Sequence, residues 1–441
     1  MLTYHIITYG CQMNKNDSER VRGVLESMGL SESIRARGSD VIVINTCSIR
    51  QKAEDRVYGH MKKFAEFKKE KPDMVLAVTG CMPGRDVKGI FREKMPAVDF
   101  YFPIKELPQF PRWLSGVRPD IVNTADEKED YLKIQPSRRT NTFQSFVSIS
   151  GGCDNYCTFC VVPFSRGRMY SRSLSETLQE VREAVTHGAI DVMLVGQNVN
   201  TYSPADIASK SALNPFHDGF AVLLWEMNQI ADLKRIHFIA ANPQDMSNEV
   251  IDALGLPKHV NYLHLPVQAG SDRVLKKMNR RYTREQYFEI IDKVKTIRPT
   301  IALGTDIIVG FCTETEEEFM ETIDLYKRVG FDISYNAQYS SRSGTVAGRL
   351  WKDDVPREEK KRRWEYLQDV MEEQTLVKNQ AYRGQTVEVL VEKYLPFKKI
   401  CVGNSREIKI VEFPGTVEMV GTIVKVRVDE ALTWVLRGSK V

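Results

Sequence analysis

The sequence contains no stretch of about 18 uninterrupted apolar residues, and this excludes a membrane-spanning helix. Its first residues, Met-Leu-Thr-Tyr-His-Ile-Ile, lack the basic region and long apolar core of a secretory signal. A strong charge of one sign is also missing, since 62 Lys and Arg against 58 Asp and Glu leave a net charge of +4. This mildly basic balance permits a nucleic-acid partner without requiring one. We therefore expect a cytoplasmic protein without a membrane partner and, from 441 residues, about three domains.

Cysteine is scarce as well, with eight residues in the chain, and without a secretory signal these predict metal ligands or catalytic groups rather than disulfides. Cys153, Cys157 and Cys160 form a C-x3-C-x2-C run. Iron–sulfur clusters are usually held by four Cys thiolates, so three ligands leave one iron open to a substrate or cofactor. A structural zinc site is the alternative, but it usually needs a second C-x2-C pair or a Cys/His mixture. In this loop the chain resembles the radical S-adenosylmethionine (SAM) enzymes.

The N-terminal part repeats an apolar strand that runs into a cysteine. The three segments are Tyr4–Cys11, Asp40–Cys47 and Asp73–Cys81, and helical stretches such as Ser18–Met28 and Ile49–Lys69 follow them. Strand–helix alternation predicts a parallel sheet, in which all strands end at one edge. Cys11, Cys47 and Cys81 are thus expected at one edge as a second three-cysteine site. The alternative is three cysteines that serve only as small core residues.

The middle of the chain resumes the alternation after a polar connection at 115–141. Six β/α units predict a partial (β/α)6 barrel whose active face lies at the strand C-termini. The expected strands are Phe146–Ile149, Val192–Val195, Arg235–Ile239, Tyr262–Leu265, Thr305–Val309 and Ile333–Gln338, and the expected helices include Leu174–Thr186, Val222–Ile230, Arg284–Ile297 and Glu316–Arg328.

The last part begins with a charged helix, Pro356–Tyr382, and then turns to short strands with turn residues between them. Such strands predict a small β-barrel. The expected strands are Val387–Val391, Ile408–Phe413, Gly421–Val428 and Thr433–Leu436. Residues 383–441 hold ten Lys and Arg against seven Asp and Glu, so this segment is slightly basic.

Five further motifs accompany the two cysteine sets. They are residues 8–14, 45–50, 196–199, 264–271 and 305–310, which read TYGCQMN, NTCSIR, GQNV, HLPVQAGS and TDIIVG. Together they resemble the methylthiotransferases, a radical SAM family with an N-terminal cluster domain and a C-terminal RNA-binding TRAM barrel. The resemblance covers essentially the whole chain and implies an α/β fold with three domains: 1–116 (methylthiotransferase domain), 141–378 (radical SAM core) and 381–441 (TRAM). Residues 8–14 and 264–271 look most like the branch that modifies N6-dimethylallyladenosine at position 37 of tRNA.

The resemblance also implies two 4Fe-4S clusters. Cys153, Cys157 and Cys160 would hold the cluster that binds and reduces SAM, and Cys11, Cys47 and Cys81 an auxiliary cluster that carries the transferred sulfur. Two SAM are used per turnover, one to methylate that sulfur and one to give the radical that removes hydrogen from C2 of adenine. The implied partners are a tRNA anticodon stem-loop carrying N6-dimethylallyladenosine and an electron donor such as flavodoxin or ferredoxin, and we expect a monomer.

Rival interpretations concern the target and the class of protein. The same chemistry can act on threonylcarbamoyladenosine in tRNA or on an aspartate of a ribosomal protein. A non-catalytic iron–sulfur protein that binds RNA is the alternative from another class. It would explain the cysteines and the barrel, but not SAM-like motifs on several strands.

Other residues have a binding role and a structural alternative. Phe159 either covers the SAM adenine or packs the loop, and Asp306 either faces the ligand or makes a structural hydrogen bond. Predicted SAM contacts, as against plain turn residues, are Gly196, Gln197, Asn198, Gln268, Gly270 and Ser271. Arg166, Arg168 and Arg172 are predicted to hold tRNA phosphates, with a solvated charge run as the alternative. Cys312 and Cys401 are expected to pack or to lie at the surface.

Overall fold

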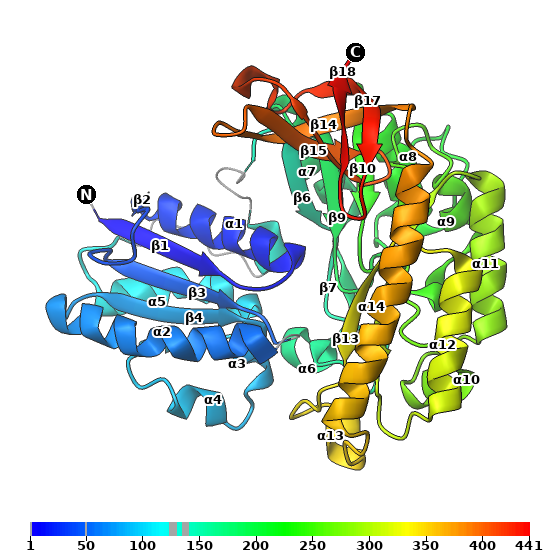
Figure 1. Ribbon diagram of the computed structural model, residues 1–441. Coiled ribbons are helices and arrows are strands. Elements are labelled where there is room, and N and C mark those ends of the chain that lie inside the picture. The colour runs from blue at the N-terminus through cyan, green and yellow to red at the C-terminus, as the bar shows by residue number, and fades with distance from the viewer. Residues whose placement is uncertain (1, 49–50, 123–129, 135–140) are drawn as a thin grey trace.

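The structure is a computed structural model that describes residues 2–48, 51–122, 130–134 and 141–441. Figure 1 shows an N-terminal sheet with its helices, a central open barrel of strands and helices, and a small C-terminal barrel at one end of the central one. Among the described residues, no helix is long and apolar enough to cross a membrane.

The N-terminal sheet has five parallel strands in the order β2-β1-β3-β4-β5. Its central strands, β3 and β4, are buried along their whole length, and their apolar runs suit a parallel sheet that helices cover on both faces. The strands are β1 Thr3–Thr8, β2 Ser31–Glu32, β3 Val41–Thr46, β4 Val75–Gly80 and β5 Phe100–Tyr101. The helices are α1 Gln12–Ser27, α2 Gln51–Glu70, α3 Cys81–Arg85, α4 Ile90–Glu93 and α5 Phe110–Val117.

The central part consists of two parallel three-stranded sheets, β6-β9-β10 and β11-β12-β13. A parallel bridge between Ile236 and His259 joins them, so six strands follow one another around an open barrel, as the sequence predicts. The strands are β6 Gln144–Ser148, β9 Asp191–Val195, β10 Arg235–Phe238, β11 Tyr262–His264, β12 Ala302–Val309 and β13 Ile333–Gln338, with a small hairpin of β7 Ser150–Gly151 and β8 Tyr170–Ser171.

Helices cover one face of these strands and leave the concave face to the barrel interior. Alternate residues of most of these strands, such as Val147, Leu194 and Ile307, belong to the large core under the helices. Because side chains alternate along a strand, their neighbours face the interior. The helices are α6 Val162–Arg166, α7 Leu174–Thr186, α8 Gly219–Asn228, α9 Asn248–Ala253, α10 Asp272–Lys277, α11 Arg284–Ile297, α12 Glu316–Val329, α13 Val346–Leu350 and α14 Arg357–Gln380.

The C-terminal part is a closed five-stranded barrel in the order β14-β15-β16-β18-β17. Its strands are β14 Thr386–Leu395, β15 Ile400–Ser405, β16 Ile410–Pro414, β17 Ile423–Ala431 and β18 Leu436–Lys440. The sequence interpretation missed β15. The strand predicted at Thr433–Leu436 is wrong, because most of that segment is the bend that precedes β18.

The small barrel docks at the N-terminal ends of the central strands. Arg235, the first residue of β10, donates to the carbonyl of Asn404 at 2.9 Å, and Lys409 pairs with Asp332, just before β13, at 2.8 Å. The C-terminal ends of the strands, where loops build the active face of such barrels, are therefore at the opposite end.

The N-terminal domain meets the central barrel along β6. Asn16 of α1 donates to the carbonyl of Phe146 at 2.9 Å, and the Ser148 hydroxyl donates to the Asn16 side chain at 2.6 Å. Deeper in the contact, buried Glu180 of α7 lies 3.5 Å from Arg20 of α1. These contacts fix the orientation of the N-terminal domain relative to the central barrel.

Candidate active site

Three cysteines lie at one edge of the N-terminal sheet, directly after neighbouring strands. Cys11 caps the start of α1, and Cys47 and Cys81 follow Thr46 and Gly80, which are paired across β3 and β4. A Cβ built on Gly10 would lie 2.9 Å from the Cβ of Cys47, so the backbone before Cys11 passes close to the second cysteine. The sheet register thus brings the three predicted ligands to the same edge.

Asn14 organises the loop around this edge. Its side-chain amide donates to the carbonyl of Thr46 at 3.0 Å, and its Oδ1 lies 3.4 Å from the Cys11 sulfur. Gly10 has φ +131°, and a side chain there would reach within 2.5 Å of Asn14 Oδ1. The motif at 8–14 thus needs both the glycine and the asparagine for geometric reasons.

The second cysteine set occupies a loop after β6 and β7. Gly152 has φ +69°, and a Cβ there would lie 2.0 Å from the carbonyl oxygen of Arg168, so only glycine lets the two backbones meet. Beyond it, Thr158 donates its backbone N–H to Met278 at 3.0 Å, and Asn279 donates to the carbonyl of Asn155 at 2.9 Å. The C-terminal end of α10 therefore clamps a loop that lies about 120 residues earlier in the chain.

Arg280 completes this clamp, and the sequence interpretation did not single it out. Its guanidinium lies 3.4 Å from the Cys157 sulfur and donates to the carbonyl of Pro266 at 2.9 Å. Although burial acts against its charge, Tyr282 and Cys157 raise the pKa of Arg280 above its usual range. A buried, positively charged side chain therefore contacts the sulfur of Cys157, the middle cysteine of the loop. The only sequence signal for it is an arginine after Met-Asn at the end of a short helix.

Cys thiolates, which make up both sets, are the usual protein ligands of iron–sulfur clusters. Among the described residues, no group of three or more Cys, His, Asp or Glu side chains is arranged to hold a metal ion. Cysteines that surround a cube need not converge on one point, because each binds a different iron. Burial raises the pKa of Cys153 to about 11 and that of Cys160 to about 12, so these thiolates need cationic iron or a similar partner to form.

The two cysteine sets are linked by a tight contact between α3 and α6. Cys81 begins α3, and α6 starts two residues after Cys160. A Cβ on Gly84 of α3 would lie 2.0 Å from the carbonyl oxygen of Ser165 in α6, so the two backbones touch. Figure 1 shows α6 reaching from the central barrel to α3.

Arg166 crosses the same contact and requires a correction. Its side chain is 2% exposed, pairs with Asp17 at 2.5 Å and donates its Nε–H to the Cys81 sulfur at 3.2 Å. Burial opposes its charge, but Asp17 and Cys81 raise the pKa of Arg166 well above its usual value. The predicted role in holding tRNA phosphates is wrong for this residue, because the guanidinium already serves partners inside the protein.

Arg172 requires the same correction, whereas Arg168 does not. Arg172 is 1% exposed and pairs with Glu180, which also meets Arg20. Arg168 is 79% exposed and pairs with Asp154 at 2.8 Å, so it remains accessible beside the cysteine loop. The sequence alone could not show which of the three arginines is buried, because their burial depends on how the N-terminal domain packs against the central barrel.

A group of buried polar side chains lies next to the cysteine loop. Asn198 donates to Asp245 at 2.7 Å, while its own Oδ1 is buried and has no hydrogen-bond partner in the described part of the chain. The same holds for Asn242 Oδ1 and for the hydroxyl of Ser150, whose oxygen a Cβ on Gly196 would approach to 2.6 Å. Asp245 also acts electrostatically on Cys153. Buried polar atoms without partners usually mark a missing ligand or water.

The other predicted SAM contacts have mixed surroundings. Gly270 packs against α12, where a Cβ would lie 2.4 Å from the Cα of Thr322, and Ser271 lies 3.5 Å from Glu318. Phe159 packs against the barrel core, Gln197 is half-buried, and buried Gln268 has φ +71°. The structure thus gives Gly270 and Ser271 packing roles, while contacts of any of these residues with SAM stay predictions. Cys312 and Cys401 are buried in hydrophobic cores, as expected.

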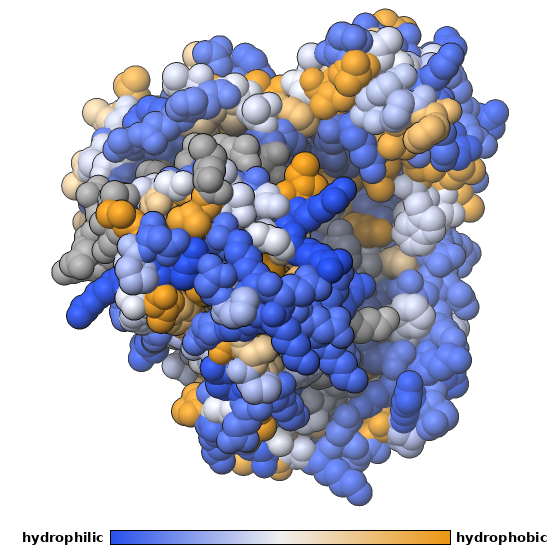
Figure 2. Space-filling view, turned by 90° about the vertical axis from the view of Figure 1, so that its left-hand side faces the viewer, coloured by the Kyte–Doolittle hydropathy of each residue, from blue (hydrophilic) through white to orange (hydrophobic). Residues whose placement is uncertain are grey.

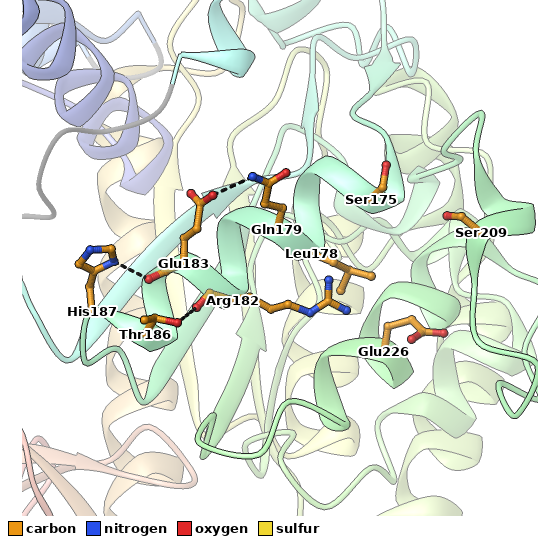
Figure 3. Close-up of a pocket in the computed structure, with 9 residues that line it drawn as sticks. All are labelled: Ser175, Leu178, Gln179, Arg182, Glu183, Thr186, His187, Ser209 and Glu226. Carbon is orange, nitrogen blue, oxygen red and sulfur yellow. Dashed lines mark hydrogen bonds between the residues drawn. The ribbon is translucent and has the colours of Figure 1, made fainter.

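A separate hollow lies on the outer surface of the central barrel (Figure 3). It has a volume of about 510 Å³ and is lined mainly by α7, including Gln179, Arg182 and Glu183, with Glu226 of α8 opposite. None of the cysteines in the described ranges lines it, and Glu183 and Gln179 bond to each other at 2.8 Å across its wall. It is distinct from the cysteine sites.

Comparison with known proteins gives matches along the chain. The Radical SAM superfamily matches residues 147–326, the uncharacterized protein family UPF0004 residues 3–103, and the TRAM domain residues 380–441. The tRNA-2-methylthio-N(6)-dimethylallyladenosine synthase of Thermoanaerobacter sp. strain X514 is 40% identical, covering 100% of this chain and 93% of its own length. The protein of the same name from Carboxydothermus hydrogenoformans is 38% identical over 99% of this chain and 98% of its own.

Solved structures support the fold. The radical S-adenosylmethionine methyltransferase TsrM of Kitasatospora setae, with cobalamin and a [4Fe-4S] cluster bound, has a TM-score of 0.57 at 13% identity. The match covers 79% of this chain and 77% of that protein. At such identity the likeness concerns the fold alone, and it agrees with the open β/α barrel described above.

Proposed function

The chain belongs to the family of tRNA-2-methylthio-N(6)-dimethylallyladenosine synthases, and from this premise we propose how its residues perform the family's reaction. The reaction is methylthiolation at C2 of N6-dimethylallyladenosine in tRNA by radical SAM chemistry. An aromatic C2–H offers little to acid–base catalysis. The protein's task is therefore to hold cofactors and substrate in register and to exclude side reactions.

Each cysteine set would hold one 4Fe-4S cluster, and two clusters supply one-electron chemistry and a sulfur source. Cys153, Cys157 and Cys160 would anchor the cluster for SAM. The set of Cys11, Cys47 and Cys81 would anchor the auxiliary cluster. Support comes from the glycines at 10 and 152, which let the backbone approach where a Cβ would collide, and from cationic Arg166 and Arg280 beside a sulfur of each set.

The observation that carries the proposal is the contact of α3 with α6. Gly84 and Ser165 touch through their backbones, one helix beginning at Cys81 and the other shortly after Cys160. The methylthio group would have to travel only a short distance from the site of Cys11, Cys47 and Cys81 to C2 of the base, because a small misplacement of reacting groups costs large factors in rate. Direct packing of α3, which begins at Cys81, against α6, which follows the loop of Cys160, supplies that register, and a binding protein without catalysis has no need of it.

SAM would bind beside the cysteine loop, next to Asn198, Asn242 and Ser150. Their unpartnered oxygens suit the donors of an amino-acid ammonium group, and Gly196 leaves room for the approach. Gln197, Gln268 and Phe159 would complete the surroundings. The use of two SAM per turnover is part of the proposal.

The remaining partners are proposed on chemical grounds. Exposed Arg168 would meet phosphates of the anticodon stem-loop near the loop of Cys153, while the small basic barrel would bind the same RNA further away. A flavodoxin or ferredoxin would supply electrons to a monomeric enzyme in the cytoplasm. The alternatives of a threonylcarbamoyladenosine or a ribosomal-protein target are not favoured by the relatives' names.

The test combines metal content with product analysis. Anaerobically reconstituted protein should hold about eight irons, four per cysteine set. Cys81→Ala and Cys157→Ala should each lose about half of them, while Cys312→Ala, at a buried cysteine outside both sets, should lose none. With reductant, SAM and N6-dimethylallyl-tRNA, mass spectrometry should find the 2-methylthio nucleoside only for the unmodified chain and Cys312→Ala. A protein with one cluster, or with zinc, would sink the proposal.

A further inference from the structure

The concave face of the second half-barrel carries an exposed aromatic side chain, Tyr335 of β13. Its neighbour Asn336 donates to Gln368 of α14 at 2.7 Å and thus points to the helix side. Alternation along the strand directs Tyr335 to the interior of the barrel, where it is 56% exposed. Its ring is therefore accessible to a molecule that enters the barrel.

Tyr335 belongs to a polar group that spans three neighbouring strands. Its ring centroid lies 5.6 Å from that of His264, whose Nε2 lies 3.3 Å from an oxygen of Asp306. The hydroxyl of Tyr262 meets the other nitrogen of His264 at 3.3 Å. The Asp306 side chain is 40% exposed and stands directly opposite Tyr335 in the pairing of β12 with β13. The group thus offers a ring face and an oriented carboxylate to the same space.

Glycine makes room for this arrangement. A Cβ on Gly304, which pairs with His264, would lie 1.9 Å from the Tyr262 hydroxyl and 3.0 Å from Nδ1 of His264. Tyr262 can therefore reach Nδ1 of His264, whose Nε2 in turn meets Asp306. Such support from neighbouring side chains is typical of binding groups that must keep one orientation.

The wall across the barrel has a different character. Phe146 and Met193 are partly buried apolar side chains at paired positions of β6 and β9, and they pack against the core of the N-terminal domain with Met13 of α1. That helix begins next to Cys11. Figure 2 shows that the molecule is hollowed beside the N-terminal domain, on the side where β13 and α14 stand in Figure 1. The barrel interior therefore has a polar side on β11, β12 and β13 and an apolar side on β6 and β9.

We propose, on the basis of the proposed function, that this group receives the target base itself. The extruded adenine stacks on Tyr335, and its N6–H, which remains after a single alkylation, donates to Asp306. The dimethylallyl chain then lies toward Phe146 and Met193. Bases taken out of a stack are commonly held by aromatic rings and by hydrogen bonds to their edges. Asp306 is thus assigned to the substrate rather than to SAM, and His264 is its positioning residue.

The experiment measures binding of two RNA hairpins by the reconstituted holoenzyme. One hairpin carries N6-dimethylallyladenosine at the target position, and the other is identical but lacks that base. For the unmodified chain the base-bearing hairpin should bind at least about fivefold more tightly. Tyr335→Ala should reduce this ratio to near one, while Tyr335→Phe should keep it. Asp306→Asn should reduce it in part, because the amide oxygen still accepts but carries no charge.

The control is Tyr366→Ala, which removes a comparably exposed tyrosine from α14 and should leave the ratio unchanged. A second readout is release of 5′-deoxyadenosine from SAM without RNA, which Tyr335→Ala and Asp306→Asn should not alter. A Tyr335→Ala protein that keeps the full ratio would overturn the inference, as would an Asp306→Asn protein that loses SAM cleavage. Failure of the unmodified chain to form any methylthio product would instead refute the proposed function, while the binding ratio would still test the base site.

Discussion

Replacing Gly84 by alanine should push apart the two helices that join the cysteine sets. The new Cβ would lie 2.0 Å from the Ser165 carbonyl oxygen, whereas real Cβ contacts essentially never fall below 3.0 Å. The difference is 1.0 Å, so α3 and α6 must separate by about that distance. Because the obstacle is backbone rather than the end of a flexible side chain, we expect an overpacking cost of about 1–3 kcal/mol.

An opposing effect has to be subtracted from this cost. Alanine in place of a helical glycine stabilises a helix by about 0.5–1 kcal/mol when space is available. Gly59 in the middle of α2 offers the matched control, because it is exposed and, apart from its chain neighbours and its own helix backbone, no atom of the described residues lies within 4 Å of the place a Cβ would take. Gly59→Ala should therefore raise the free energy of unfolding, and Gly84→Ala should lower it by about 1–2 kcal/mol.

Urea unfolding of the holoprotein measures the stability of both variants, and the slope of the transition shows whether they unfold over the same surface. Activity supplies a second readout, the methylthio nucleoside formed per 5′-deoxyadenosine released. Gly84→Ala should lower this ratio, because in the proposed mechanism SAM cleavage needs only one cysteine set while transfer needs both in register. If Gly84→Ala were as stable as Gly59→Ala and kept the ratio of the unmodified chain, the assigned role of the α3–α6 contact would be wrong.

Three further predictions concern buried charges. Arg280→Met removes a cationic donor 3.4 Å from the Cys157 sulfur, so the reduction potential of that cluster should become more negative in a titration followed by electron paramagnetic resonance. Arg166→Met leaves buried Asp17 without its partner and should cost about 3–5 kcal/mol in urea unfolding, whereas the double change with Asp17→Asn should recover part of the loss. Burial lowers the pKa of His259 to about 3, so the unfolded state takes up a proton between about pH 6.5 and pH 3 that the folded state does not. The contribution of His259 to stability is therefore complete above about pH 6.5 and falls by about 1.4 kcal/mol per pH unit below it. His259→Gln should make the dependence of unfolding free energy on pH less steep in this range. An unchanged dependence would contradict this prediction.

The sequence could predict the frame of the molecule because its strands are short, apolar and followed by diagnostic residues. The placement of Cys11, Cys47 and Cys81 at one sheet edge followed from parallel topology alone. Strand β15 was missed, since Ile400–Ser405 alternates weakly and follows a lysine-rich turn. The strand expected at Thr433–Leu436 was misplaced because β-favouring residues also occur in the bend before β18.

The parts of the site that depend on long-range packing could not be predicted. Arg166 and Arg168 are two residues apart, yet one is enclosed by the N-terminal domain and the other faces solvent. Arg280 reaches Cys157 only because α10 ends against the cysteine loop. Tyr335 lies beside His264, which meets Asp306, only because neighbouring strands bring these residues together. Their separation in the sequence gives no sign of this contact.

The opposite placement of the small barrel and the cysteine loops sets a minimum size for any molecule that engages both. The longest central strand, β12, has eight residues, and at about 3.3 Å per residue the distance between the two ends is about 26 Å. A free nucleoside or a dinucleotide is too short to reach from one end to the other. A substrate that met both ends, as proposed, would have to span about this distance, so chain length itself becomes a criterion for accepting it.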